Sequence, residues 1–155
     1  MDTLIPMTQP EFLAYIEESI PSYAADKVAS GQWSELEALA LSRKTFDELL
    51  PQGLATPDNQ LFTIVDADSR RVGMLWIAVQ DRAGRRVAYV YDVSIAPEHR
   101  RQGHAVRAFE ALEAKVRDMG LAGIGLHVFG HNHGAQALYA RLGYQTTNIN
   151  MFKAL

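Results

Sequence analysis

The sequence predicts an α/β (α+β) domain whose mixed, mostly antiparallel sheet is flanked by helices, in the order α-α-β-β-β-α-β-α-β. Three observations support this fold class. The chain has 155 residues and an ordinary globular composition, which suits one domain. The spacing of apolar residues changes from helical to strand-like near residue 60. Strand-like and helical segments then alternate toward the end of the chain, which implies some parallel pairing.

The first third of the chain is predicted to form two helices. Apolar residues recur at helical spacing from Phe12 to Tyr23, and Pro21 is expected to break or kink this first helix. Ser34 and Glu37 have the spacing of a capping box, in which each side chain bonds the other residue's backbone. A second helix is therefore expected to begin at Ser34 and to end at Pro51.

Three strands are expected in the middle of the chain. Segments 61–66, 72–80 and 87–95 are rich in β-branched and aromatic residues. Short polar turns separate them, which is typical of an antiparallel meander, and Pro97 ends the third strand.

The rest of the chain is expected to alternate between helices and strands. A helix is predicted from His104 to Met119, with Gly120 as its C-terminal cap. A short strand follows at 124–129, then a helix that ends at Gly143, and a closing strand from Tyr144 to Phe152.

Composition excludes several classes of protein. The chain has no cysteine, which excludes disulfide scaffolds, thiolate metal sites and a cysteine nucleophile. Its longest apolar run, Met74 to Val79, is far shorter than the roughly 20 residues of a membrane helix. A net charge of −3 argues against nucleic acid as a partner. We therefore expect a cytoplasmic protein that binds neither nucleic acid nor a membrane.

The charge is divided unevenly along the chain. Residues 1–60 carry ten acidic and three basic side chains, a net charge of −7. Residues 61–155 carry eight acidic and twelve basic side chains, a net charge of +4. This division suggests that two ligands of opposite charge meet on one domain.

The segment Pro97–Ala105, which reads PEHRRQGHA, has the features of an anion site. It joins a predicted strand to a predicted helix, whose first N–H groups lack partners within the helix. Gly103 lets a ligand approach the backbone, and Arg100 and Arg101 add positive charge. The segment therefore predicts a phosphate or pyrophosphate site. The chain has neither the Gly-Lys pair of a Walker loop nor, in this turn, the three glycines of a dinucleotide fingerprint.

Two ordered motifs resemble those of the GNAT superfamily of N-acyltransferases. Residues 100–105 read Arg-x-x-Gly-x-Ala, which resembles the family's pyrophosphate-binding signature. The next strand leads to Asn132, followed by Leu138-Tyr139 and Leu142-Gly143-Tyr144, which resembles its second signature. The predicted order of elements over residues 1–155 is also similar to that of the family.

The resemblance implies a single domain over residues 1–155. Residues 1–60 would form the helical acceptor side, and residues 61–155 the sheet and the CoA-binding core. The implied activity is direct transfer of the acetyl group from acetyl-CoA, the acyl-donor substrate, to a primary amine of a small molecule or peptide. No metal is implied. The acidic first third, with Glu11, Glu17, Glu18, Asp26, Glu35 and Glu37, favours a cationic acceptor.

The resemblance also implies roles for individual residues. Those that would bind acetyl-CoA are Val93, Ile95, Arg100, Arg101, Gln102, Gly103, His104, Ala105 and Asn132. The His104 side chain would either face the ligand or lie on the surface. Tyr139, two helical turns after Asn132, would protonate the departing thiolate. Asp92 interrupts an apolar run near the expected reaction centre and is the candidate base.

Alternative interpretations stay open for these residues. Tyr139 could instead be a packing residue, and Asp92 a structural carboxylate at a strand bulge. His127, His131 and His133 have spacing compatible with zinc, but no carboxylate lies near them in the sequence and we expect no metal. His127 is expected instead to be a strand residue near the cofactor, and His131 a loop or helix-cap donor.

The function and the assembly also have alternatives. A module that binds acyl-CoA and regulates a partner without turnover would carry the same motifs, and an O-acetyltransferase would differ only in its acceptor. The predicted closing strand offers an edge for pairing in a homodimer.

Overall fold

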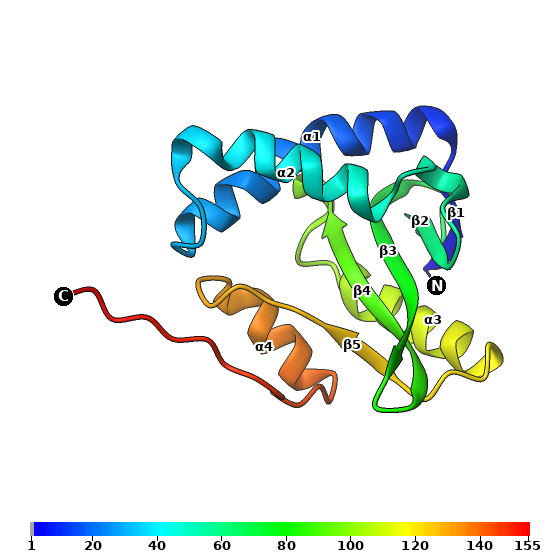
Figure 1. Ribbon diagram of the computed structural model, residues 1–155. Helices are drawn as coiled ribbons and strands as arrows, with labels where there is room; N and C mark the ends of the chain where they lie inside the picture. Colours follow the sequence, from blue (N-terminus) through cyan, green and yellow to red (C-terminus); the bar gives the residue numbers. More distant parts are fainter. Residues whose placement is uncertain (1) are drawn as a thin grey trace.

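A five-stranded sheet in the order β1-β2-β3-β4-β5 forms the centre of the computed structural model, which describes residues 2–155 (Figure 1). All neighbouring strands are antiparallel except β4 and β5, which are parallel. The predicted fold class, a mixed and mostly antiparallel sheet flanked by helices, is therefore confirmed. The strands are β1 Thr3–Pro6, β2 Asn59–Val65, β3 Arg71–Arg82, β4 Arg85–Ile95 and β5 Ile124–Leu126.

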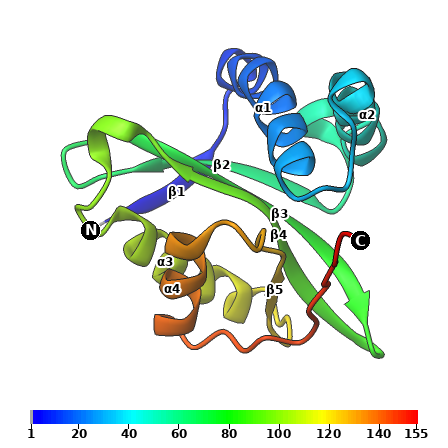
Figure 2. The ribbon, with the colours of Figure 1, turned by 90° about the vertical axis from the view of Figure 1, so that its left-hand side faces the viewer.

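Helices cover both faces of the sheet: α1 and α2 lie on one face, and α3 and α4 on the other (Figure 2). The helices are α1 Gln9–Ala29, α2 Glu35–Leu49, α3 His104–Asp118 and α4 His133–Arg141, with 3-10 turns η1 Gly53–Ala55 and η2 Pro97–His99. Across residues 2–155, none of the helices combines the length and the apolar character needed to span a membrane.

Each face of the sheet has its own hydrophobic core because side chains alternate along a strand. Leu61 and Trp76 point toward α1 and α2, where they pack with Phe46. Their neighbours Phe62 and Leu75 point the other way, into a core that also holds Phe109, Leu112 and Val116 of α3.

The helices form where they are predicted, but two local details differ. α1 continues through Pro21 as one helix, so the expected break, one of the two outcomes predicted for this proline, does not occur. The capping box forms at Thr8 and Glu11 of α1, whereas the Ser34 side chain makes no capping bond at the start of α2. The Glu11 carboxylate also pairs with Arg71 of β3 at 2.7 Å, which ties the start of α1 to the sheet.

The predicted element order is wrong at both ends of the chain. β1 was not predicted, since four residues ending in Pro6 give little strand signal until β2 pairs with them. The predicted closing strand from Tyr144 to Phe152 is not a strand in the structure. Residues 145–155 extend away from the other elements, so they have no strand beside them to pair with (Figure 1).

Candidate active site

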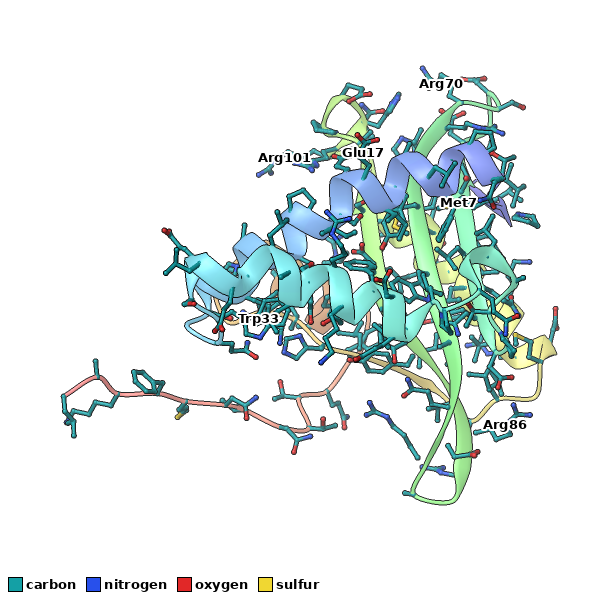
Figure 3. The ribbon with its side chains drawn as sticks, turned by 45° about the horizontal axis from the view of Figure 1, so that its top comes forward. Met7, Glu17, Trp33, Arg70, Arg86 and Arg101 are labelled. Carbon is teal, nitrogen blue, oxygen red and sulfur yellow. The ribbon has the colours of Figure 1, made fainter. Side chains whose placement is uncertain are left out.

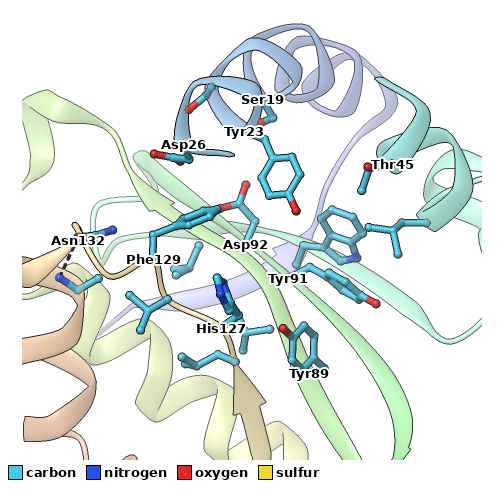
Figure 4. Close-up of a pocket in the computed structure, with 18 of the residues that line it drawn as sticks. Ser19, Tyr23, Asp26, Thr45, Tyr89, Tyr91, Asp92, His127, Phe129 and Asn132 are labelled. Carbon is cyan, nitrogen blue, oxygen red and sulfur yellow. Dashed lines mark hydrogen bonds between the residues drawn. The ribbon is translucent and has the colours of Figure 1, made fainter. Parts of the chain in front are cut away.

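A cleft of about 330 Å³ opens where β4 and β5 separate (Figure 4). The two strands pair only over Ala88–Val90 and Ile124–Leu126. Beyond this point the end of β4 and the chain that follows β5 diverge, and the cleft lies between them. Helices α1, α2 and α4 also contribute lining residues, which include Tyr15, Tyr23, Asp26, Asp92, His127, Asn132 and Tyr139.

A bulge in β4 directs Asp92 toward the cleft. Trp76 of β3 pairs with Asp92, and the next residue, Ile77, pairs with Val90, so Tyr91 is the extra residue. Because of this insertion, Tyr91 and Asp92 both face α1 and α2: Tyr91 packs on that core and Asp92 bonds to Tyr15 of α1. Without the bulge, the alternation of a regular strand would turn one of the two toward the opposite face.

Asp92 is a half-buried carboxylate with a strong hydrogen-bond donor. The Tyr15 hydroxyl donates to Asp92 Oδ2 at 2.6 Å. Burial raises the pKa of Asp92, and the hydrogen bond from Tyr15 opposes this effect. Burial and the neighbouring Asp92 charge hold the pKa of Tyr15 well above its usual value, so Tyr15 stays protonated and remains the donor. Asp92 lies beside the bulge and also lines the cleft. It can therefore be both a structural carboxylate and the candidate base.

Tyr139 lies on α4 with its ring in the core and also lines the cleft. The ring packs edge-on against Phe109 at 5.5 Å and against Tyr144 at 5.7 Å between centroids. Burial, with a smaller contribution from the Asp92 charge, raises the pKa of Tyr139 to about 12. The phenol is therefore protonated throughout the neutral pH range. The core contacts of Tyr139 make it a packing residue as well as a cleft residue.

Aromatic rings form a continuous wall along one side of the cleft. Tyr23 contacts Phe46 at 5.9 Å, and Phe46 contacts Trp76 at 5.9 Å. Trp76 stacks on Tyr91 at 4.7 Å, and Tyr91 meets Tyr89 at 4.9 Å. A wall of this kind suits an apolar group or a cation, since the faces of aromatic rings attract positive charge.

The loop between β5 and α4 lines the cleft and contacts α1. His131 Nε2 lies 3.2 Å from Asp26 Oδ1. The Phe129 ring stacks on His131 with centroids 5.4 Å apart and lies 6.2 Å from the Tyr23 ring. These contacts join the loop to the C-terminal end of α1 beside the cleft.

Basic groups also line the cleft. His127 and Lys27 both face it, and burial lowers the pKa of each. The charge of Lys27 lowers the pKa of His127 further, which keeps the imidazole neutral at neutral pH and able to accept a proton.

Sequence reasoning missed the roles of two of these residues. Tyr15 appears in the sequence only as part of the apolar repeat of α1, although a buried phenol generally needs a hydrogen-bond partner. His127 is expected from the sequence only as a strand residue near the cofactor, without a role as a base. Its position one residue after β5 was the available signal, because β5 is parallel to β4 and the two strands end at the same side of the sheet.

The turn between β4 and α3 has the backbone geometry of an anion site. Arg101 and Gly103 have positive φ values of 61° and 81°, a pattern that turns successive N–H groups toward one point. No side chain caps α3, and the N–H groups from Arg101 to Val106 have no partner among the described residues. The turn from Arg101 to Gly103 is exposed, so an anion could reach it.

The start of α3 is anchored to the N-terminal end of the chain. Asp2 accepts a hydrogen bond from His104 Nδ1 at 2.8 Å and from Arg107 Nε at 3.1 Å. Arg107 Nη2 also donates to the Gln102 carbonyl at 2.7 Å, which fixes the turn. The His104 side chain is buried beneath the turn, where it contacts Asp2. The expectation that it lies on the surface is therefore wrong, and its Nδ1 faces Asp2.

The remaining predicted residues lie along β4 and at the start of α4. Val93 and Ile95 follow the bulge, on the part of β4 that no longer pairs with β5. Arg100 is exposed, and its Nε donates to the Ile95 carbonyl at 3.0 Å. Asn132 caps α4 and accepts from the Ala135 N–H at 3.1 Å, as the dashed line in Figure 4 shows. Its carboxamide NH₂ stays available to a ligand in the cleft.

The acidic residues of α1 and α2 do not form a wall of the cleft. Of the six acids in the first third that were expected to favour a cation, only Asp26 lines it. Among residues 2–155, no three His, Cys, Asp or Glu side chains are grouped as a metal site would require.

Comparisons with known proteins agree with this geometry. The family model described as the acetyltransferase (GNAT) family matches residues 24–144. The uncharacterized N-acetyltransferase YycN of Bacillus subtilis (strain 168) is 37% identical over 98% of this chain and 97% of its own length. The uncharacterized N-acetyltransferase YdgE of the same organism is 32% identical over 99% of this chain and 98% of its own.

Solved structures show the same fold. The crystal structure of YycN from Bacillus subtilis has a TM-score of 0.95 and 36% identity, covering 100% of this chain and 99% of that one. A Pyrococcus furiosus protein described as an acetyl transferase has a TM-score of 0.68 with full coverage of both chains, and its 22% identity supports the fold alone.

The hydrogen bond between Tyr15 and Asp92 gives the first testable prediction. Tyr15→Phe removes a donor that stabilises the ionised carboxylate, so we expect a higher pKa for Asp92 than in the unmodified chain. The measurement is an NMR titration of the Asp92 carboxyl carbon. Tyr91→Phe is the matched control, because its hydroxyl bonds Gln80 instead. An Asp92 pKa that is unchanged or lower in Tyr15→Phe would contradict the interpretation.

Proposed function

Because this chain belongs to the acetyltransferase (GNAT) family, we propose that it is an N-acetyltransferase that transfers the acetyl group of acetyl-CoA directly to a primary amine. The observation that carries the proposal is the arrangement along β4. A cleft with a titratable carboxylate lies at the bulge, and an unpartnered cluster of N–H groups follows the end of the same strand. An extended acyl donor could bind its anionic end at the N–H cluster and place its reactive end in the cleft.

The turn before α3 suits the pyrophosphate of acetyl-CoA. Its free N–H groups, the positive φ values of Arg101 and Gly103, and the start of the helix all favour a multiply charged anion. Gly103 has a φ of 81°, a left-handed conformation that favours glycine, and a Cβ there would also lie 2.6 Å from Arg107 Nη1 and displace that side chain. When bound, acetyl-CoA supplies the acetyl group as an activated thioester.

The unpaired edge of β4 suits the pantetheine arm. Val93 and Ile95 lie beyond the last pair between β4 and β5, so their strand has a free edge there. We expect backbone groups of these residues to hydrogen-bond the amides of the arm, as a neighbouring strand would. The carboxamide NH₂ of Asn132 would add a donor from the opposite side of the cleft.

Asp92 is the proposed proton acceptor for the attacking amine. A protonated amine cannot attack, so a group in the cleft must hold the proton. The raised pKa of Asp92 makes it a stronger base than an exposed aspartate, and Tyr15 orients it. His127, whose imidazole is neutral at neutral pH, is a second acceptor in the same cleft.

Tyr139 is proposed to stabilise the departing thiolate by donating a hydrogen bond. With a pKa of about 12, the phenol is a weaker acid than an ordinary thiol, whose pKa is about 8.5. Complete proton transfer from Tyr139 to the sulfur is therefore uphill, whereas donation of a hydrogen bond to the developing charge is favourable. The proton that neutralises the thiolate would then come from the amine by way of the base.

The acceptor is proposed to be a cationic amine. The aromatic wall and the carboxylates of Asp26 and Asp92 favour a positively charged group. Because the other acids of α1 and α2 lie outside the cleft, these two carboxylates and the rings favour the cation, and the net charge of the segment does not.

The function is tested by following the release of CoA thiol from acetyl-CoA in the presence of polyamines, aminoglycosides, amino acids and peptides. We expect turnover with at least one amine, and mass spectrometry should show a product heavier by one acetyl group on nitrogen. Products acetylated only on hydroxyl groups would favour O-transfer. Binding of acetyl-CoA without transfer to any acceptor, together with a protein partner, would favour a regulatory module.

Gly103→Ala should weaken acetyl-CoA binding. An added Cβ meets Arg107 and strains a φ of 81°, so we expect the Kd to rise by about tenfold or more, measured by calorimetry. Gly120→Ala is the matched control at the other end of α3. Gly120 has a φ of 72°, and nothing lies within 4 Å of an added Cβ. Its substitution therefore introduces backbone strain without a steric contact. Equal Kd values for the two variants would contradict the proposed site.

Tyr139→Phe should lower kcat by about 10²-fold with little change in KM, because the lost hydrogen bond acts in the transition state. Since the phenol titrates only near its pKa of about 12, activity of the unmodified enzyme should not decline through Tyr139 below about pH 10. Tyr144→Phe is the control, because Tyr144 touches the Tyr139 ring and lies outside the cleft. Full turnover in Tyr139→Phe at every pH would remove the residue from the mechanism.

A further inference from the structure

Lys27 is a half-buried cation of the cleft that the proposed reaction does not use. No ion pair within residues 2–155 includes it. Asp26 precedes it on α1, but consecutive helical side chains do not face each other, and Asp26 contacts His131 instead. Burial lowers the pKa of Lys27, and no neighbouring anion offsets this effect. A half-buried cation without a counter-ion favours an anionic ligand.

The contacts of Lys27 hold its ammonium group in place without neutralising it. Nζ lies 5.6 Å from the centre of the Tyr23 ring and 5.3 Å from that of Trp33, which lies in the turn between α1 and α2 (Figure 3). The backbone N–H of Trp33 donates to the Lys27 carbonyl at 3.3 Å. Nζ itself donates to Gln32 Oε1 at 2.9 Å. An ammonium group has three N–H donors, so two remain for a ligand.

Two phenols add hydrogen-bond donors beside Lys27. The hydroxyls of Tyr23 and Tyr89 point toward the middle of the pocket (Figure 4). Within residues 2–155 the bonded tyrosine hydroxyls are those of Tyr15 and Tyr91, so these two are free to bind a ligand. Burial raises the pKa of both phenols, and Tyr89 raises that of Tyr23 further, as expected for neighbours. Both phenols are therefore protonated donors at neutral pH.

The reacting end of the cleft has the opposite charge. The charge of Asp26 adds to the effect of burial in raising the pKa of Asp92, so two carboxylates lie near each other there. The Asp92 charge also acts on Tyr139, the proposed donor to the thiolate. The charge of Lys27 acts on His127 instead. The cleft therefore has an acidic part at the reaction centre and a basic part around Lys27.

The size of the cleft restricts the acceptor to a small molecule. Its volume of about 330 Å³ is near the lower end of the roughly 300–1,000 Å³ of small-molecule sites. Part of this space must receive the acetyl group and the end of its carrier. The space that is left suits a molecule of amino-acid size rather than a folded protein or an aminoglycoside.

We propose that the acceptor is a free amino acid whose amine reacts beside Asp92 and whose carboxylate binds Lys27. The hydroxyls of Tyr23 and Tyr89 would donate further hydrogen bonds to the carboxylate. This inference rests on the proposed function and assigns a substrate class to it. The two charges of an amino acid match the two parts of the cleft, whereas the second amine of a diamine would lie beside a cation.

The carboxylate takes no part in the bond changes. A C–N bond forms between the amine and the acetyl carbon, and the C–S bond of the thioester breaks. The proton that the nitrogen loses neutralises the thiolate by way of the base. The products are an N-acetylated amino acid and CoA.

The first test compares acetyl transfer to amino acids with transfer to matched analogues. Each amino acid, α or ω, is paired with its carboxamide and with the amine that lacks the carboxyl group. For at least one amino acid we expect kcat/KM to exceed that of both analogues by about tenfold or more, because only the carboxylate makes charge-assisted hydrogen bonds. Transfer to amines without any preference for a carboxylate would overturn the inference and leave the proposed function intact.

Substitution of Lys27 tests whether it is the source of the preference. Lys27→Met should lower the ratio of kcat/KM for the amino acid to that for its carboxamide by about tenfold, chiefly through KM. Lys27→Glu should also raise kcat/KM for diamines. Lys44→Met is the matched control, because Lys44 lies on α2 outside the cleft, where it pairs with Glu48 at 3.8 Å, and the ratio should stay the same. An unchanged ratio in Lys27→Met would overturn the inference.

Binding is measured without turnover so that the inference and the proposed function can fail separately. The full chain is saturated with CoA, which has no acetyl group to transfer, and saturation-transfer NMR follows the binding of each amino acid and its carboxamide. We expect an amino acid to bind the unmodified chain and Lys44→Met, and to lose binding in Lys27→Met. Such binding without acetyl transfer to any amine would overturn the proposed function alone. Binding of no amino acid, or binding that does not depend on Lys27, would overturn the inference.

Discussion

The loss of pairing between β4 and β5 is the constraint on which the site depends. The strands are joined over only three residue pairs, and the bulge at Tyr91 follows directly where pairing ends. Because of this single extra residue, Tyr91 and Asp92 both face α1 and α2. The cleft and its carboxylate therefore lie at the same point of β4, where the bulge begins and the pairing with β5 ends.

The turn before α3 depends on a second long-range constraint. Asp2 and His104 are 102 residues apart, yet their buried contact joins the strand at the edge of the sheet to the first turn of the helix. Arg107 extends the contact to Gln102, so a carboxylate beside β1 supports the backbone that presents free N–H groups to solvent. The free N–H groups are thereby held in position without a side-chain cap that would compete with an anion for them.

The sequence was sufficient for most helices and strands because their signals are local. Apolar periodicity located α3 and the meander, and the order of two motifs indicated the family. Signals that depend on distant partners were not visible: β1 exists because β2 pairs with it, and the bulge at Tyr91 has no sequence marker. The same local motif can also give different outcomes at two places in the chain. Thr8 and Ser34 both precede helices with a glutamate three residues later, and only Thr8 forms the capping box.

Asp92 shows how the fold balances stability against chemistry. Burial raises its pKa above the ordinary 3.8, so the folded chain binds this proton more tightly than the unfolded chain does. By linkage, the contribution of Asp92 to stability falls as pH rises from the unfolded pKa through the folded one, and at neutral pH the ionised group is a net cost. Tyr15 reduces that cost with a hydrogen bond at 2.6 Å without abolishing it. A carboxylate kept for stability alone would have its pKa lowered, as that of Asp66 is by Arg70. The opposite shift at Asp92, in a cleft, is the arrangement expected of a group that must take up a proton.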